Sequence, residues 1–228
     1  MSWFKGLFGK DDRPIPDYWN HYLELFKTKT PSNTAIKDLR FVVLDTETTG
    51  FDKDKKILSI GAIALQGGRI AMQDSFEALL HQVDMANNAE AISVHGITPT
   101  ASSNGQVIET VLEDWVEYIG NAILVAHNAQ YDIGMLNGMI QTQFDGKLKN
   151  KVLDTADLAI RLEKYGEDPS TIKRSEYTLD ELCNRYNIEV HDRHTAAGDA
   201  FLTAKLLLLL LTKAEKRGIK TYGELRLK

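Results

Sequence analysis

The sequence predicts an α/β domain that is built on a mixed five-stranded sheet with helices on both faces. Three observations predict this fold class. The chain of 228 residues is 43% hydrophobic, which is enough to form a sizeable core. The continuous apolar run at residues 41–44 is typical of a central strand that is buried on both faces. Beyond it, strand patterns first follow one another and then alternate with helical patterns, as expected for an antiparallel meander followed by parallel strands.

Five strands account for this sheet. Residues 41–44 form the first and residues 57–65 the second. Gly67-Gly68 marks a tight turn, so residues 69–76 are expected to pair antiparallel with the second strand. Short apolar runs complete the set at residues 122–126 and 152–153.

Helices are predicted where apolar residues recur at helical spacing. The pattern Thr178-Leu-Asp-Glu181 matches a capping box, so a helix is expected to begin there. A last helix is predicted over residues 195–212. The other helices carry their apolar positions at Val107, Val111, Trp115 and Ile119, at Met135, Met139 and Ile140, and at Leu158 and Leu162.

Residues 1–35 are predicted to be an extension of the main domain, which covers residues 36–215 and leaves 216–228 as a short C-terminal tail. Asp17 is expected to cap a short helix in this extension, and Pro31-Ser32-Asn33 is expected to end it. The aromatic face of this helix needs a partner, and the main domain is the expected one. Contact with a membrane or with a second chain is the alternative. The face consists of Tyr18, Trp19, Tyr22, Leu23 and Phe26.

Composition and charge exclude few partners. The net charge of -5 argues against a generally basic nucleic-acid-binding surface, but two divalent cations would locally cancel four acidic residues in one metal site. Cys183 is the single cysteine, so no intrachain disulfide forms and a reducing, cytoplasmic location is expected. The N-terminus lacks the long apolar run of a signal peptide, and the run at residues 206–211 is too short to span a bilayer. We therefore expect no membrane association.

Asp45-Thr46-Glu47 closes the predicted central strand. Residues two apart on a strand point to the same face, so both carboxylates are aimed at one place. Paired acids resist ionisation unless a positive charge lies between them, and oxygen-only ligands favour a hard cation such as Mg²⁺ or Mn²⁺. Gly50 then permits a sharp turn close to a ligand. The alternative is a strand that ends in a solvated acidic turn.

The second acidic segment is His127-Asn-Ala-Gln-Tyr-Asp132, where a predicted strand gives way to a helix. Ligands gather at strand ends of this kind in open α/β sheets. Asp132 lies near the start of the helix, where the helix dipole favours a negative charge. Alternatively, Asp132 is an ordinary first-turn charge and Asn128 an ordinary loop residue.

The third segment is His194-Thr-Ala-Ala-Gly-Asp199. Residues five apart on a helix do not share a face, so His194 is predicted to lie in the loop before the helix and Asp199 within it. The small residues 196–198 keep the first turn slim, which is expected to leave room for substrate. Asp199 precedes a strongly apolar stretch, so its charge needs a partner such as a metal ion. Alternatively, His194 is a surface histidine; the neighbouring His191 is expected to take no part.

Together, the three motifs resemble the DEDDh exonuclease family, whose best-known member is the proofreading epsilon subunit of bacterial DNA polymerase III. Their order and spacing agree with that family, and the resemblance covers roughly residues 39–211. Val94-His-Gly-Ile-Thr98 and Leu153-Asp-Thr155 are weaker landmarks, and Tyr131 stands where the family often has phenylalanine. The length and element order fit the ribonuclease H-like architecture of this family.

The resemblance implies a 3′–5′ exonuclease that uses two Mg²⁺ or Mn²⁺ ions. Asp45, Glu47 and Asp199 would hold one ion, Asp45 would bridge to the second, and Asp132 would act there directly or through water. His194 would accept the proton of the attacking water. The products would be a nucleoside 5′-monophosphate and a shortened strand with a 3′-OH.

The resemblance also implies substrate contacts. Thr46, Glu47 and the backbone around Thr48 would meet the terminal nucleotide and its 3′-OH. His95 would line the nucleotide pocket, although it is equally expected as a loop histidine beside a glycine turn. Further contacts with the nucleotide and its phosphates would come from Asn128 and Tyr131, and from the cations Lys53, Lys55, Lys56 and Arg193, although charge runs usually form solvated faces.

Three other functions stay open. An RNA-trimming relative would share the fold and the metals and would differ only in its 2′-OH contacts. A polymerase-associated subunit would dock through residues 1–35, and the same extension could join a homodimer. A catalytically dead binding module is disfavoured, because all four carboxylates and His194 are present. Residues 218–228 are too short for a long polymerase-tethering tail, so we expect a stand-alone enzyme that acts on single-stranded DNA in preference to RNA.

Overall fold

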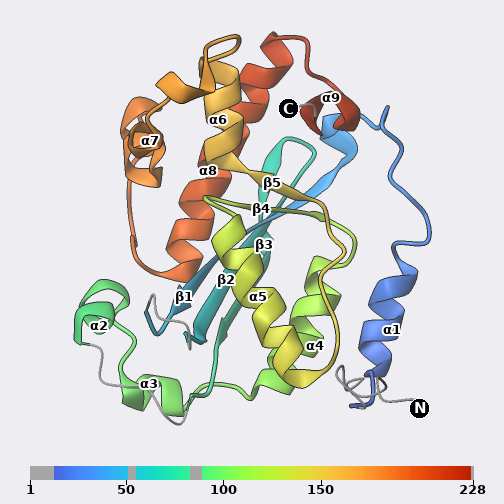
Figure 1. The fold of residues 1–228 in the computed structure, drawn as a ribbon, viewed down its shortest axis with the longest axis vertical. Coiled ribbons are helices and arrows are strands. Elements are labelled where there is room, and N and C mark those ends of the chain that lie inside the picture. Colours follow the sequence, from blue (N-terminus) through green and yellow to red (C-terminus); the bar gives the residue numbers. More distant parts are fainter. Residues whose placement is uncertain (1–12, 51–54, 83–88, 227–228) are drawn as a thin grey trace, which may run out of the picture.

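A mixed sheet forms the centre of the protein, for which a computed structural model describes residues 13–50, 55–82 and 89–226. Its strands lie in the order β3-β2-β1-β4-β5 (Figure 1). The β1–β2 and β2–β3 pairs are antiparallel, whereas β4 runs parallel to β1 and β5 parallel to β4. The predicted five-stranded mixed sheet is confirmed. The strands are β1 (Arg40–Thr48), β2 (Ile57–Gln66), β3 (Arg69–Leu79), β4 (Ile123–Ala126) and β5 (Val152–Asp154).

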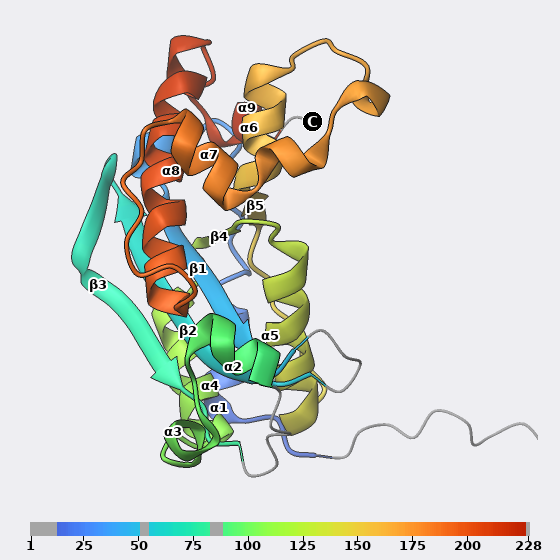
Figure 2. The same cartoon turned by 90° about the vertical axis from the view of Figure 1, so that its left-hand side faces the viewer.

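Helices cover both faces of this sheet, as predicted. Side chains alternate along β1, so Phe41 and Val43 enter one hydrophobic cluster and Val42 and Leu44 enter another. Figure 2 shows the long helix α8 running along β1 and β2 on the first of these faces. The first face is covered by α6 (Thr155–Glu163), α7 (Leu179–Arg185), α8 (Ala196–Lys216) and α9 (Tyr222–Arg226), and the second by α1 (Asp17–Glu24), α4 (Ile108–Ile119) and α5 (Gln130–Gln143).

The apolar run at residues 206–211 is part of α8, as predicted. Leu206, Leu207 and Leu210 are fully buried, whereas Leu209 is 40% exposed. The three buried leucines therefore lie on the side of α8 that packs in the core, and Leu209 points away from it. Among the helices that the structure describes, none has both the length and the apolar character needed to cross a bilayer.

Several short elements were not expected from the sequence. These are the helices α2 (Ala89–His95), α3 (Pro99–Ser103) and α9, together with single turns of 3-10 helix at Ile36–Asp38, Pro169–Thr171 and Arg174–Tyr177. Helices of this length are too short to show an apolar period. The two ends of the last long helix also differ slightly from the prediction, since α8 begins at Ala196 and not at residue 195, and ends at Lys216 and not at residue 212.

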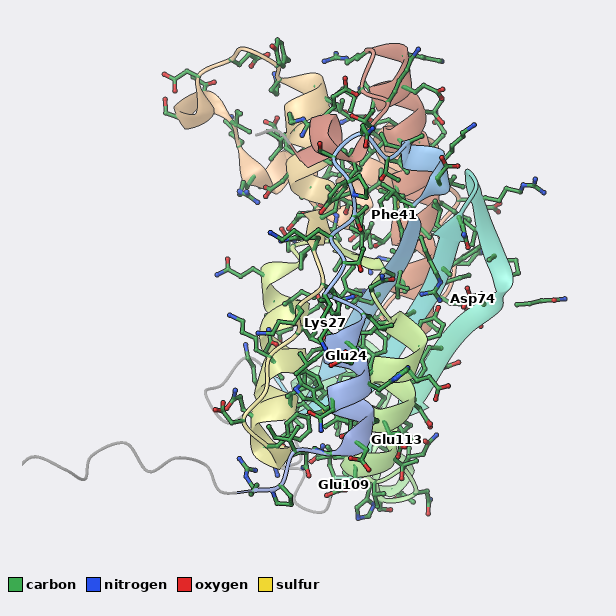
Figure 3. The ribbon with its side chains drawn as sticks, turned by 90° about the vertical axis from the view of Figure 1, so that its right-hand side faces the viewer. Glu24, Lys27, Phe41, Asp74, Glu109 and Glu113 are labelled. Carbon is green, nitrogen blue, oxygen red and sulfur yellow. The ribbon has the colours of Figure 1, made fainter. Side chains whose placement is uncertain are left out.

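The N-terminal helix α1 packs on the main domain, as predicted. Trp19 is 2% exposed and its ring centroid lies 5.0 Å from that of Phe144. The Tyr22 hydroxyl donates to Asn150 Oδ1 at 2.6 Å and accepts from the Lys149 amide at 2.7 Å. Figure 3 shows α1 lying against α4, whose Glu109 and Glu113 are beside it.

Two details of α1 were predicted wrongly. Asp17 does not cap the helix: Pro16 occupies the N-cap position, with its backbone extended, and Asp17 is the first helical residue. Proline suits the boundary because its ring fixes φ near the value the helix needs. The helix ends at Glu24, well before Pro31, so the predicted stop signal is not what ends it.

The C-terminal segment packs beside the chain that leads into β1. The Ile36 amide donates to the Lys220 carbonyl at 3.0 Å, and the Tyr222 amide donates to the Thr34 carbonyl at 2.8 Å. Tyr222 and Leu225 of α9 are buried in the same cluster as α8. The domain boundaries at residues 35/36 and 215/216 stay a prediction.

Candidate active site

Three carboxylates from two distant segments meet at the end of β1. Asp45 and Glu47 project toward α8, and Asp199 projects from the first turn of α8 toward them. One oxygen from each of the three lies within 4.8 Å of the others. We call these three residues the acid cluster. Its convergence was expected from the alternation along the strand and from the position of Asp199 inside the helix.

A glycine in β2 allows α8 to come this close. Gly61 pairs with Asp45 across the sheet, and a Cβ atom on it would lie 2.2 Å from the backbone of both Ala196 and Ala197. The first turn of α8 therefore rests directly on the β2 backbone. Gly61 was missed in the sequence, although a glycine inside a strand pattern is a known signal of close backbone approach.

Small residues at the start of α8 allow close packing, and the expectation that they also leave room for substrate stays a prediction. A Cβ on Gly198 would lie 2.0 Å from the Asp192 carbonyl oxygen, so this glycine is required by the loop before the helix. Ala196 is buried against the sheet. The Thr195 hydroxyl caps the helix by accepting from the Gly198 amide at 3.1 Å.

Asp132 reaches the same strand from the opposite face. It lies in the first turn of α5, is 3% exposed, and its Oδ1 accepts from both the Thr46 amide at 3.0 Å and the Thr46 hydroxyl at 2.7 Å. Asp132 is not part of the acid cluster, but its charge acts on Asp45 and Glu47. Of the four acids that were predicted to share one place, Asp45, Glu47 and Asp199 therefore lie together, and Asp132 lies on the other face of β1.

Asp154 and His127 hold the loop that positions Asp132. Asp154 accepts from the amides of Ala129 and Ala156, both at 2.8 Å, and so caps α6 while fixing the turn before α5. His127 bridges Thr155 Oγ1 at 2.9 Å and the Tyr177 carbonyl at 3.0 Å. The sequence marked Asp154 only as a landmark, yet an Asp that directly precedes a helical pattern is a typical N-cap signal.

Burial makes the carboxyl groups of Asp45, Glu47 and Asp132 reluctant to ionise. Burial, and then the charges of Asp132 and Asp199, raise the pKa of Asp45 well above its usual range. Burial and the same two neighbours raise the pKa of Glu47 to about 7. Burial raises the pKa of Asp132 to about 6, against the opposing effect of its hydrogen bonds from Thr46.

The acid cluster fits a hard divalent cation. Asp199 Oδ1 is buried and has no hydrogen-bond partner among the described residues, which is unusual for a carboxylate oxygen. The ligand atoms that these three residues offer are all carboxylate oxygens, and such ligands suit Mg²⁺ or Mn²⁺. A cation would satisfy the orphaned oxygen and relieve the repulsion between the acids.

The comparison with protein families agrees with this geometry. A family model described as an exonuclease, RNase_T, matches residues 42–207. The chain belongs to this exonuclease family. Its predicted membership of the DEDDh exonucleases, and the ribonuclease H-like fold that goes with it, are confirmed.

The relatives of this exonuclease include much longer proteins. The DNA polymerase III of PolC type from Halalkalibacterium halodurans is 34% identical over 195 residues, which make up 85% of this chain and 13% of that polymerase. The PolC-type polymerase of Bacillus subtilis is 34% identical over 196 residues, with the same two shares. The chain thus spans only 13% of the length of these relatives.

Solved structures share the fold. E. coli exonuclease I in complex with a dT13 oligonucleotide matches with a TM-score of 0.64 at 17% identity, over 79% of this chain and 43% of that one. The nuclease domain of 3′hExo, a DEDDh family member bound to rAMP, matches with a TM-score of 0.63 at 12% identity, over 78% of this chain and 94% of that one.

The other site residues predicted for this exonuclease differ in their exposure and in their contacts. His194 is exposed, in the loop before α8, with a positive φ of 62°. The hydroxyls of Thr48 and Tyr131 lie 2.7 Å apart and join the end of β1 to the start of α5. Asn128 is exposed beside them and also has a positive φ, of 60°. Their contacts with substrate stay predictions.

Thr46 and His95 are more enclosed than expected for substrate contacts. The Thr46 side chain is 7% exposed and its hydroxyl is occupied by Asp132. His95 ends α2, is 8% exposed, and its Nδ1 accepts from the Ile97 amide at 3.0 Å. Their roles at the terminal nucleotide also stay predictions.

The four cations that were predicted to contact phosphate differ in their surroundings. The Lys55 ammonium lies 4.1 Å from the centroid of the Tyr131 ring, so a cation is held beside the predicted substrate residues. Lys56 is exposed nearby. Arg193 instead pairs with the carboxylates of Asp180 and Asp199. Lys53 lies outside the described residues.

Proposed function

We propose that this chain is a metal-dependent 3′–5′ exonuclease that acts on DNA and releases nucleoside 5′-monophosphates. Nuclease activity follows from the family; the direction, the metals and the polymer are the proposal. The observation that carries it is the acid cluster itself, in which one oxygen from each of Asp45, Glu47 and Asp199 lies within 4.8 Å of the others, and in which Asp199 Oδ1 is buried without a hydrogen-bond partner among the described residues. Such a group is suited to holding cations against a phosphodiester.

Four carboxylates would hold two Mg²⁺ or Mn²⁺ ions. Asp45, Glu47 and Asp199 would hold the first, and Asp45 with Asp132 the second, with Asp132 acting directly or through water. When bound, the ions would acidify a water molecule and offset charge on the phosphate. The position of Asp132 behind the strand, tied to Thr46, supports a less direct part for this residue.

His194 is the candidate base. It precedes α8, at whose first turn Asp199 lies, and its left-handed backbone keeps the imidazole off the helix and open to solvent. An imidazole in this position would accept the proton of the attacking water. Lys55, held against the Tyr131 ring, would neutralise a phosphate of the strand, and the Thr48 and Tyr131 hydroxyls would contact the terminal nucleotides.

The relatives support DNA as the polymer. The curated proteins that are 34% identical to this chain are named DNA polymerases. A polymerase-linked role remains a second candidate on the same ground. However, the aromatic residues Trp19 and Tyr22 of the N-terminal helix are already buried in the main domain, so any partner of the extension would have to contact other residues.

The decisive experiment compares two polymers of one sequence. Single-stranded DNA and RNA labelled at the 5′ end are incubated with the protein in Mg²⁺ or Mn²⁺, and the products are resolved by length. We expect a ladder that shortens from the 3′ end on DNA, weaker cleavage of RNA, and none with EDTA. Asp199→Asn should abolish the ladder, whereas Asp157→Asn, which removes an exposed carboxylate paired with Arg174, should keep it. A ladder that persists in EDTA, or none on either polymer, would contradict the proposal.

The base has its own test. His194→Ala should lower kcat by roughly 10²–10⁴-fold, the usual contribution of a general base, because the variant lacks the proposed proton acceptor. Mg²⁺ binding, measured by calorimetry, should be unchanged, since His194 is not among the proposed ligands. His191→Ala is the matched control, because His191 is exposed and pairs with Glu189. A kcat near that of the wild type would remove His194 from this role.

A further inference from the structure

One arginine is built into the wall of the acid cluster. Arg193 donates from Nε and Nη2 to the two oxygens of Asp180, at 2.7 and 3.0 Å, and from Nη1 to Asp199 Oδ2. Its side chain is 20% exposed. The guanidinium is therefore fixed by Asp180 of α7 and aimed at Asp199 of α8.

Arg193 gives the two oxygens of the Asp199 carboxylate different surroundings. Oδ2 is taken by the guanidinium, while Oδ1 is buried and has no partner among the described residues. Asp199 itself is only 7% exposed. A buried carboxylate that faces Asp45 and Glu47 would be strongly destabilising without a positive charge beside it. Arg193 supplies that charge in the protein as it stands.

We propose that Arg193 is the internal counter-ion of the acid cluster, which keeps the metal-free site assembled and which a bound divalent cation makes dispensable. The inference rests on the proposed function, because the cation site is part of it. Arg193 would then be a positioning residue that acts through Asp199, and its charge would oppose the entry of a cation into the site it preserves.

A counter-ion role for Arg193 predicts a change in Mg²⁺ affinity that a purely structural role does not. The free energies of folding and of Mg²⁺ binding form one cycle. A substitution that destabilises the metal-free fold more than the metal-bound fold must tighten metal binding by the difference. A residue that only packs would destabilise both folds equally and leave the affinity unchanged. A residue that only orients Asp199 for the metal would weaken the affinity.

The test compares Arg193→Gln, Arg193→Lys and Arg185→Gln with the wild type, using Mg²⁺ alone and no nucleic acid. Arg185 is the matched control, because it is a partly buried arginine that pairs with Glu163 away from the cluster. Binding is measured by calorimetry, and stability by urea unfolding in EDTA and in saturating Mg²⁺. We expect Arg193→Gln to lower the urea midpoint in EDTA, to regain most of it in Mg²⁺, and to bind Mg²⁺ about tenfold more tightly, a modest electrostatic effect for a partly exposed charge.

The controls separate charge from shape. Arg193→Lys keeps the charge and should bind Mg²⁺ with the wild-type Kd, and Arg185→Gln should lose the same stability in EDTA and in Mg²⁺. If Arg193→Gln does not fold in EDTA, refolding it in Mg²⁺ should restore the native state. An unchanged or weaker Mg²⁺ affinity, or a failure to fold even with Mg²⁺, would overturn the inference. A wild-type protein that binds no Mg²⁺ would instead contradict the proposed function.

Discussion

Glu47 shows how burial, together with the charges of Asp199 and Asp132, favours the protonated form of a carboxyl group in the acid cluster. Its pKa is about 7 in the folded protein, against an ordinary value of 4.5. Between these two values the folded protein binds more protons than the unfolded chain. The free energy of unfolding therefore falls as the pH rises through this window, because folding must then hold an ionised carboxylate near others. Asp132, with a pKa of about 6, contributes in the same direction.

We therefore predict that the metal-free protein loses stability as the pH rises from 4.5 toward 7, and that Mg²⁺ flattens this slope. The physical reason is that a cation favours the ionised carboxylates. The measurement is the urea midpoint as a function of pH, in EDTA and in Mg²⁺. Glu47→Gln is the control, because it keeps the shape and removes the titration, so its slope in EDTA should be shallower. Equal slopes for the two proteins would refute the assignment of this titration to Glu47.

The main site residues could be predicted from the sequence, and their partners could not. Asp45 and Glu47 follow from strand alternation, and the separation of His194 from Asp199 follows from helix geometry. The pairing of Arg193 with Asp180 depends on a loop in which Asp192 and His194 both adopt positive φ. Such backbone angles are uncommon for these residues and leave no periodic pattern in the sequence. The partners of Arg193 could therefore not be predicted, and Arg193 was expected to contact phosphate instead.

At the scale of elements, the contact between β2 and α8 decides whether the site forms. Gly61 lies opposite Asp45, and the first turn of α8 rests on it. The helix brings Asp199 to the acid cluster only because no side chain separates the two backbones. The strands and long helices could be predicted because their apolar residues form runs or helical periods in the sequence, whereas this contact depends on the absence of a side chain at Gly61.

Gly61→Ala should therefore disturb both stability and activity. The added Cβ would overlap the backbone of Ala196, and backbone cannot rotate away, so we expect a loss of about 1–3 kcal/mol of unfolding free energy. The turnover of DNA should fall further than this loss of stability explains, since Asp199 moves with the helix. Gly138→Ala is the control, because a Cβ there meets no atom within 4 Å, and it should be neutral or stabilising. Wild-type activity and stability in Gly61→Ala would show that α8 tolerates the displacement.

For the whole molecule, the two ends of the described chain are parts of one fold. α1 completes the hydrophobic cluster on one face of the sheet, and α9 completes the cluster on the other. The aromatic pattern of α1 predicted that it packs on the main domain, but could not say where, because the residues bonded to Tyr22 lie 127 and 128 positions away in the sequence.

The Tyr22 hydroxyl provides a test of this view of α1. It satisfies both Asn150 Oδ1 and the Lys149 amide in a buried setting, so Tyr22→Phe leaves two polar groups without their partner. We expect a loss of about 1–3 kcal/mol of unfolding free energy, measured by urea unfolding. Tyr18→Phe, on the same helix but only partly buried, should cost much less. The kcat of both variants should match the wild type, because neither residue belongs to the acid cluster. A selective loss of kcat in Tyr22→Phe would show that α1 takes part in the reaction, and equal stability of the two variants would show that α1 is not anchored at this point.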